Sequence, residues 1–141
     1  MMLKLFKFKK EDVFHINLAF DFPPEMRQSM VEHKDVTGYT LYQDKDILCI
    51  GGIHGLWNGV GEAWFLIGKE GYDNPKSVAK HTFFMFEHLQ QEHGFSRVQA
   101  SVAKKDRKAV RFVEWLGFKN EGIMEKYGPD GSDYYRYARV L

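Results

Sequence analysis

Helix signals gather in the stretch Asp106-Arg107-Lys108-Ala109-Val110-Arg111-Phe112-Val113-Glu114-Trp115-Leu116-Gly117-Phe118. Asp106 is a residue type that caps helices, because its carboxylate can accept a free backbone N–H. From Ala109 onward, apolar residues recur at the i, i+3, i+4 and i+7 positions of one helix face. Gly117 is typical of the position just after a helix. The stretch therefore predicts a short amphipathic helix.

The segments on either side of this helix predict strands and a longer helix. Apolar and polar residues alternate from Arg97 to Val102, as in a strand. Before it, Asn74 and Pro75 suit the start of a helix that runs to about His93. After the helix, strands are expected at Ile123–Tyr127 and Tyr134–Val140, joined by a turn rich in Gly and Pro.

The N-terminal half predicts one strand, two helices and three antiparallel strands. The expected ranges are strand Leu3–Phe8, helices Glu11–Phe20 and Pro24–His33, strands Gly38–Gln43, Ile47–Ile53 and Glu62–Gly68, and an irregular stretch Lys69–Asp73. The order is β-α-α-β-β-β-α-β-α-β-β. It predicts an α+β fold with one mixed sheet, in a single domain spanning residues 1–141.

Composition and charge narrow the function classes. Of 141 residues, 44% are hydrophobic, which is ample for one core. The formal net charge of +1 argues against a dedicated nucleic-acid binder. No apolar run reaches the length of a membrane span, and the N-terminus lacks the features of a signal peptide. We therefore expect a cytoplasmic protein with no membrane partner.

Cys49 is the only cysteine, so an internal disulfide and a Cys-based zinc site are excluded. It lies in an apolar run, where buried packing is favoured over a nucleophilic role.

Residues 106–118 resemble a segment of the GNAT (Gcn5-related N-acetyltransferase) family, which reads asparagine, two residues, alanine, an aromatic or leucine, and ends in Leu-Gly-Phe. The continuation Lys119-Asn120-Glu121-Gly122 and the Tyr-rich hairpin are similar to the tail of that family. The predicted order of elements matches the GNAT fold over nearly the whole chain. Small phage-encoded GNAT-like proteins are the subgroup that the chain resembles most.

Three positions depart from the family pattern. The family's phosphate loop, Gln or Arg, two residues, Gly, one residue, Gly or Ala, does not match the stretch from Lys69 to Val78. Asp106 replaces the helical asparagine. Val113 occupies the position of the tyrosine that many members use as general acid. These departures bear on cofactor affinity and on catalysis.

The resemblance implies binding of acetyl-CoA as co-substrate and transfer of its acetyl group to a primary amine. The cofactor-binding positions that it implies are Phe65, Leu66, Ile67, Lys69, Lys76, Ser77, Val78, Asp106, Ala109 and Phe112. Backbone N–H groups around Leu66 are expected to polarise the thioester carbonyl, and Ala109 to face the pantetheine arm.

Helix geometry supports part of this set. The first N–H groups of a helix have no partner within it, so those of Lys76, Ser77 and Val78 could hold a phosphate. An ordinary capped helix is the alternative. A basic cluster, Lys104, Lys105, Arg107, Lys108 and Arg111, could meet the 3′-phosphate of CoA or simply be solvated.

Acyl transfer to an amine needs a base. Glu62 opens the strand expected to carry the thioester and is the first candidate, with a strand-end charge as the alternative. His54 is the next candidate. With Val113 in place of tyrosine, Tyr127 is the candidate proton donor to the departing thiolate, although Tyr134 and Tyr135 are also available.

Two hypotheses follow. The first is an N-acetyltransferase acting by direct attack of the amine on acetyl-CoA. The second is a GNAT-like domain without catalysis, retained as a binding or structural module, for example in a phage particle. The sequence does not identify the acceptor or the oligomeric state.

Overall fold

The computed structural model describes residues 3–19, 28, 32 and 36–141. The elements are β1 (Leu3–Lys7), α1 (Asp12–His15), β2 (Val36–Gln43), β3 (Asp46–Trp57), β4 (Val60–Ile67), α3 (Lys69–Tyr72), α4 (Pro75–Glu92), β5 (Arg97–Ala103), α5 (Arg107–Trp115), β6 (Lys119–Met124) and β7 (Tyr134–Val140). The predicted helix Pro24–His33 lies outside the described residues, apart from Gln28 and Glu32, which are both helical.

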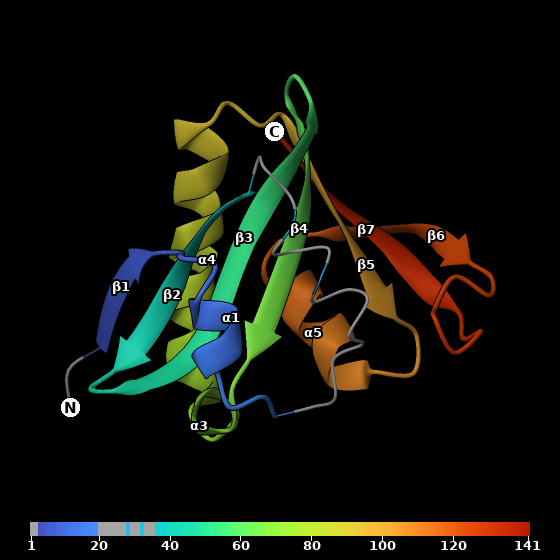
Figure 1. Ribbon diagram of the computed structural model, residues 1–141. Helices are drawn as coiled ribbons and strands as arrows, with labels where there is room; N and C mark the ends of the chain where they lie inside the picture. Colours follow the sequence, from blue (N-terminus) through green and yellow to red (C-terminus); the bar gives the residue numbers. More distant parts are fainter. Residues whose placement is uncertain (1–2, 20–27, 29–31, 33–35) are drawn as a thin grey trace.

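All seven strands form one sheet in the order β1-β2-β3-β4-β5-β7-β6. Only the pair β4–β5 is parallel among these strands, and the chain crosses between them through α4. In Figure 1, α4 and α5 lie behind the sheet and α1 lies in front of it. The predicted α+β class with a mixed sheet is confirmed.

Each face of the sheet carries its own apolar core. Behind the sheet, Met85, Phe86 and Leu89 of α4 pack with Val113 and Leu116 of α5. In front, a second cluster joins α1 to the middle of the sheet, with members Val13, Ile16, Ile47, Ile50, Trp64 and Leu66. Along β4, alternate residues therefore belong to different cores, as the period of two in a strand requires.

Several predicted bounds hold closely. β7 has the predicted limits, α4 begins at Pro75, and Asp106 caps α5, its Oδ1 accepting the N–H of Ala109 at 3.1 Å. A hairpin turn at Trp57-Asn58-Gly59 connects β3 to β4, and Gly59 has the positive φ of 81° that such a turn requires.

Three predicted elements are wrong in extent. The strand expected at Ile47–Ile53 is β3, which continues to Trp57 because it stays paired with β4 as far as Trp57–Val60. The helix expected from Glu11 ends at His15, because Asn17–Ala19 pairs with the end of β4 instead: the Ala19 N–H donates to the Ile67 carbonyl at 3.0 Å. The strand expected at Ile123–Tyr127 is β6, which ends at Met124. There Lys126 takes a positive φ of 56° and its N–H is held by Asp133 at 3.0 Å, so the chain leaves the sheet.

The stretch Lys69–Asp73, expected to be irregular, contains the helical turn α3. This turn packs its backbone directly on β3, where a Cβ built at Gly71 would lie 2.1 Å from the Leu48 carbonyl oxygen. Only a residue without a Cβ fits between α3 and β3. Gly71 thereby fixes the path of the connection from β4 to α4.

We predict that Gly71→Ala destabilises the protein by about 1–3 kcal/mol, because backbone atoms on both sides must move to accept the methyl group. At this chain length each kcal/mol corresponds to a shift of about 2–4 °C in Tm, which thermal unfolding followed by circular dichroism measures. An unchanged Tm would show that α3 does not pack on Leu48 as described.

Candidate active site

The central feature of the site is an opening between β4 and β5. The two strands pair at Val60–Arg97, Gly61–Val98 and Glu62–Gln99, and the pairing then stops. Both strands continue, β4 to Ile67 and β5 to Ala103. Figure 1 shows the two arrows diverging toward α3 and the start of α5. The edge of β4 beyond Glu62 is therefore not paired with β5.

Backbone direction identifies which residue of β4 faces the opening. The Gly68 N–H donates to the Leu48 carbonyl of β3 at 2.8 Å. The backbone groups of the neighbouring Ile67 therefore point away from β3, and the Ile67 carbonyl accepts the N–H of Ala19. Since backbone groups alternate in direction along a strand, Phe65 also faces the opening, whereas Leu66 faces β3. The backbone donors around Leu66 that face the opening are thus the N–H groups of Phe65 and Ile67.

Helix α5 closes the back of the opening. The rings of Phe65 and Phe112 lie 5.1 Å apart, and both pack against the cluster of Leu41, Leu48, Cys49 and Val78. Ala109 lies one helical turn before Phe112 and is half-buried. Phe65, Ala109 and Phe112, which were predicted as cofactor-binding positions, are therefore brought to the same region.

The N-terminus of α4 points its free N–H groups toward the same end of the sheet. Among the described residues no side chain caps α4, because the Asn74 amide donates instead to the Glu70 carbonyl at 2.9 Å. The N–H groups of Lys76 and Ser77 precede the first intrahelical bond. Val78 does not belong with them: its N–H donates to the Asn74 carbonyl at 3.1 Å, so the prediction of a free N–H at Val78 is wrong.

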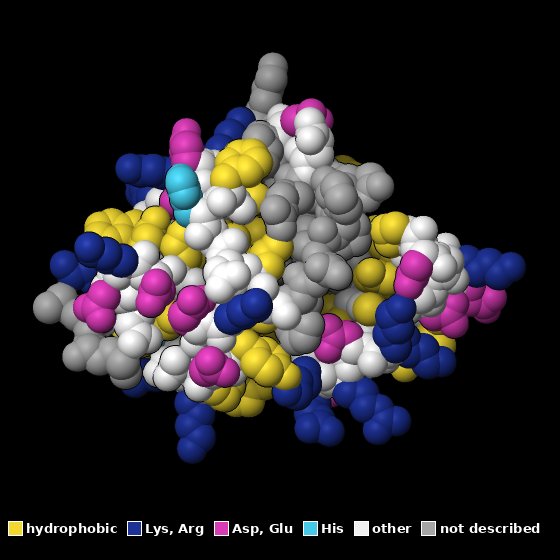
Figure 2. All heavy atoms as spheres, turned by 60° about the horizontal axis from the view of Figure 1, so that its bottom comes forward, with side chains coloured by type: hydrophobic (Ala, Val, Ile, Leu, Met, Phe, Trp, Pro, Cys, Tyr) yellow, Lys and Arg dark blue, Asp and Glu magenta, His cyan; other side chains and the backbone are white. Residues whose placement is uncertain are grey.

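Positive charge gathers at the same edge. The exposed cations here are Lys69, Lys76, Lys104, Arg107 and Lys108, whereas Lys105 is paired with Asp130 at 2.7 Å. Figure 2 shows Lys and Arg side chains along the lower edge of the molecule. Lys108 of α5 lies over the Tyr72 ring, 4.2 Å from its centroid, and also donates to the Tyr72 hydroxyl. This contact joins α3 to α5 across the opening.

A row of polar side chains, called the polar row below, crosses the front face of the sheet where the pairing of β4 and β5 ends. Its members are Glu62, Arg97, Gln99, Glu121 and Arg136. Glu62 lies opposite His54 of β3 and opposite Gln99 of β5. One nitrogen of Arg136, Nη1, donates to both oxygens of Glu62 at 3.0 and 3.2 Å, and the Gln99 amide lies 3.4 Å from Oε1. Glu62 is thus paired and only one-fifth exposed, at 21% of its side chain.

The row continues toward β6. Arg97 donates to the side-chain oxygen Oε1 of Gln99 at 3.1 Å and forms a two-point ion pair with Glu121 at 2.6 and 3.0 Å. The hydrogen bonds from Arg97 hold the pKa of Glu121 below its ordinary value. The row therefore contains two carboxylates and two guanidinium groups, each engaged with an opposite charge.

Tyr127 lies near this row. Its hydroxyl is 3.5 Å from the Ser101 hydroxyl, and Ser101 follows Gln99 on the same face of β5. The side chain is half exposed, at 51%, and its ring lies 5.4 Å from that of Tyr134. The two predicted catalytic residues, Glu62 and Tyr127, thus share one face of the sheet.

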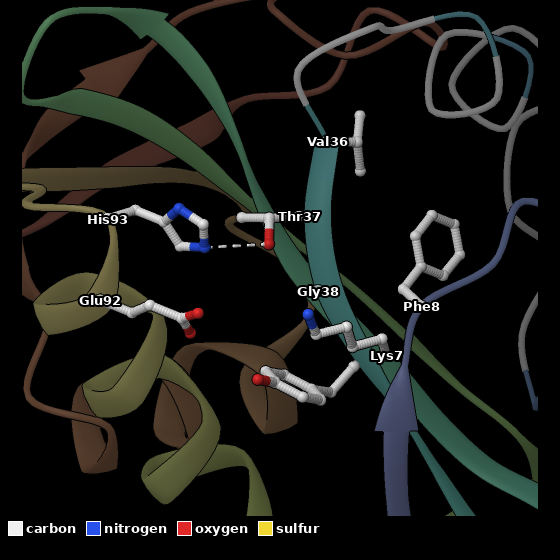
Figure 3. A pocket seen from close by; sticks show the side chains of 8 residues that line it. Lys7, Phe8, Val36, Thr37, Gly38, Glu92 and His93 are labelled. Atoms are coloured by element: carbon white, nitrogen blue, oxygen red, sulfur yellow. Dashed lines mark hydrogen bonds between the residues drawn. The ribbon is translucent and has the colours of Figure 1, made fainter.

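A second hollow lies away from the opening, at the β1–β2 edge of the sheet, and Figure 3 shows it. It is lined by Lys7, Phe8, Val36, Thr37, Gly38, Tyr39, Glu92 and His93. The Thr37 hydroxyl is 3.3 Å from the His93 Nε2. Because β2 and β3 separate this hollow from β4, it takes no part in the candidate site.

The described residues contain no group of three His, Cys, Asp or Glu side chains placed to hold a metal ion. None of the helices in these ranges is long and apolar enough to cross a membrane.

Solved structures match this arrangement over nearly its whole length. A GNAT-family acetyltransferase from Streptococcus pneumoniae superposes with a TM-score of 0.73 at 16% identity, with 99% of each chain covered. A spermidine N-acetyltransferase variant from Vibrio cholerae gives 0.74 at 14% identity, covering 98% of this chain and 93% of that one. An IAA acetyltransferase from Bacillus cereus gives 0.77 at 14% identity, covering 99% and 100%.

The chain has the GNAT fold. No family model matches the sequence, and no curated protein matches it closely enough to be a relative. The fold is therefore established by three-dimensional similarity, as the resemblance of residues 106–118 predicted.

Val113 and Asp106 differ from the GNAT pattern, and each has a structural role. Val113 is 6% exposed in the core behind the sheet, so this position holds a packed apolar side chain that has no proton to donate. Asp106, in place of the family's asparagine, serves as the cap of α5.

Sequence reasoning missed Arg136 and Gln99. A period-2 pattern in the last strand places Arg136 on the face opposite Tyr135 and Tyr137. Nothing in the sequence, however, indicates that β7 lies beside β5, which is what allows Arg136 to reach Glu62. The last strand holds two arginines, Arg136 and Arg139, so an arginine among aromatic residues does not single out Arg136.

Cys49 lies 4% exposed in the core, and burial raises the pKa of its thiol to about 12. Because only the thiolate is nucleophilic, we predict that the folded protein does not react with Ellman's reagent at pH 8, whereas the protein in guanidinium chloride releases one equivalent of thionitrobenzoate. Rapid reaction of the folded protein would contradict the burial of this thiol.

Proposed function

We propose that the chain is an N-acyltransferase that binds acetyl-CoA in the opening between β4 and β5 and transfers its acetyl group to an amine. The observation that carries the proposal is the end of β4–β5 pairing at Glu62–Gln99 while both strands continue. It leaves the N–H and C=O of Phe65 directed at a strand edge that β5 does not fill. An extended amide chain such as pantetheine can pair with such an edge as a strand would.

The phosphates of CoA would lie at the wide end of the opening, where β4 and β5 end at Ile67 and Ala103. The narrow end is at Glu62 and Gln99, where their pairing stops. The free N–H groups of Lys76 and Ser77 and the dipole of α4 favour an anion at the wide end. The exposed lysines of this edge add charge, and Lys108 is close enough to α3 to contact the same group.

The acyl group would then lie at the narrow end, beside Glu62. The amine nitrogen attacks the thioester carbonyl carbon, the C–S bond breaks, and an N–H proton leaves to a base. Glu62 is the carboxylate at that end, and His54 stands opposite it on β3. The departing thiolate takes a proton from Tyr127 or from water.

A non-catalytic GNAT-like module is the second candidate. Three observations favour it: Phe65 and Phe112 pack against each other at the back of the opening, the Lys108–Tyr72 contact spans it, and Arg136 already engages both oxygens of Glu62. Measuring acetyl-CoA binding and turnover separately distinguishes the two functions. Structural similarity does not choose the acceptor, since neighbours of this fold include spermidine and IAA acetyltransferases.

We predict that acetyl-CoA raises Tm, since a ligand that binds only the folded state stabilises it, and that Ala109→Trp abolishes this shift. Ala109 is half-buried on α5 beside the opening, so an indole there would fill the space for the pantetheine arm. Glu125→Trp, which places the same ring at an exposed position after β6, is the control and should retain the shift. Normal binding by Ala109→Trp would contradict this placement of the cofactor.

Glu62→Gln should lower turnover by about a hundredfold to ten-thousandfold, because the amide keeps the shape of the side chain but cannot accept the proton. Acetyl-CoA affinity should change little, since Glu62 lies on the front face rather than at the phosphate end. Steady-state release of CoA and calorimetric titration measure the two quantities. Turnover above about half that of the parent protein would leave His54 as the candidate base.

A further inference from the structure

We infer that the acceptor is an amine that also carries a carboxylate, of the α-amino-acid type, and that Arg136 binds this carboxylate. The inference rests on the proposed function and deepens it. Its basis is the charge balance of the polar row at the narrow end of the opening, where Glu62 and Arg136 stand side by side.

Both carboxylates of the row are already paired with arginines, so neither is free to pair with a purely cationic acceptor. Glu62 is engaged by Arg136 through both of its oxygens, and Glu121 is engaged by Arg97 in the same way. A polyamine placed here would bring positive charges next to two arginines. Among the described residues of the row, no unpaired negative charge compensates them, so such an acceptor loses electrostatic energy on binding.

An amine that carries its own carboxylate faces the opposite situation. Its carboxylate can accept the Arg136 guanidinium, and its amine can then approach Glu62. The ion pair between Glu62 and Arg136 is then replaced by two ion pairs, Arg136 with the acceptor's carboxylate and Glu62 with its ammonium group. Each of the four charges has a partner. Guanidinium and carboxylate also match in geometry, since they form two parallel hydrogen bonds.

The exchange has a mechanistic consequence. In the free protein Glu62 is held by Arg136 and is poorly placed to take a proton from an incoming amine. When the acceptor's carboxylate draws Arg136 away, both oxygens of Glu62 become available. The acceptor would thus release the base that its own amine needs. The two side chains are 21% and 23% exposed, so an acceptor can reach them from the front face.

The test compares matched acceptors on the unaltered protein. The standard L-α-amino acids, their α-carboxamides, putrescine and spermidine are supplied with acetyl-CoA, and CoA release and acetylated product are measured. We expect the best amino acid to exceed its own carboxamide by about 10–100-fold in kcat/KM, the range for a hydrogen bond to a charged group. Carboxamides or polyamines acetylated as well as the amino acids would overturn the inference.

Two variants examine the residue itself. In Arg136→Gln the acid-to-amide ratio should fall to near one, partly because the carboxamides improve once Glu62 is no longer held. A merely structural role for Arg136 would lower both kinds of acceptor alike and leave the ratio unchanged, which would also overturn the inference. Arg97→Gln, which removes the other arginine of the row, is the control and should retain the ratio.

The experiment separates this inference from the proposed function. Acetyl-CoA binding, followed by the shift in Tm, is measured in parallel. Binding together with acetylation of carboxylate-free amines keeps the acyltransferase and overturns the acceptor class. Absence of both binding and acetylation overturns both. The comparison on the unaltered protein needs no variant, so it decides the matter even if Arg136→Gln does not fold.

Discussion

The rest of the structure depends on one constraint: β4 and β5 are parallel neighbours that pair over their first residues and then separate. A parallel pair needs a crossover, and α4 supplies it behind the sheet. The separation begins at Glu62–Gln99 and is maintained from behind by Phe112, which packs on Phe65. Because α4 and α5 both begin at the wide end, the free N–H groups and the lysines of that edge gather where the strands diverge most.

The same geometry explains why the polar row lies where it does. At the narrow end, the strands are still close enough for side chains of β4, β5 and β7 to meet on the front face. Glu62, Gln99 and Arg136 form hydrogen bonds there, although they come from distant parts of the chain. The row is balanced in charge, and under the proposed function Arg136 is the residue through which this balance would restrict the acceptor.

Much of the fold could be predicted from the sequence because its signals are local. The cap at Asp106, the face that begins with Ala109 and the proline that opens α4 each specify an element boundary through contacts within a few residues. Predictions failed where a distant partner decided the outcome. The helix from Glu11 ends early because Ala19 pairs with Ile67, and the helical turn α3 forms where Gly71 meets Leu48.

The candidate site divides in the same way. Glu62, Ala109 and the start of α4 could be proposed from strand and helix ends together with the family resemblance. The free N–H at Val78 was wrong because the first intrahelical bond already uses it. Arg136 could not be found, because its role depends on β7 lying beside β5, which no local pattern encodes.

Amide NMR shows whether acetyl-CoA pairs with the edge of β4 at Phe65. In a titration of ¹⁵N-labelled protein with acetyl-CoA, pairing at this edge should produce a large shift of the Phe65 amide resonance and slower hydrogen exchange there. The Leu66 amide, already bonded toward β3, should keep its exchange rate. An unchanged Phe65 amide at saturating acetyl-CoA, or protection at Leu66 alone, would contradict pairing of the ligand with this edge.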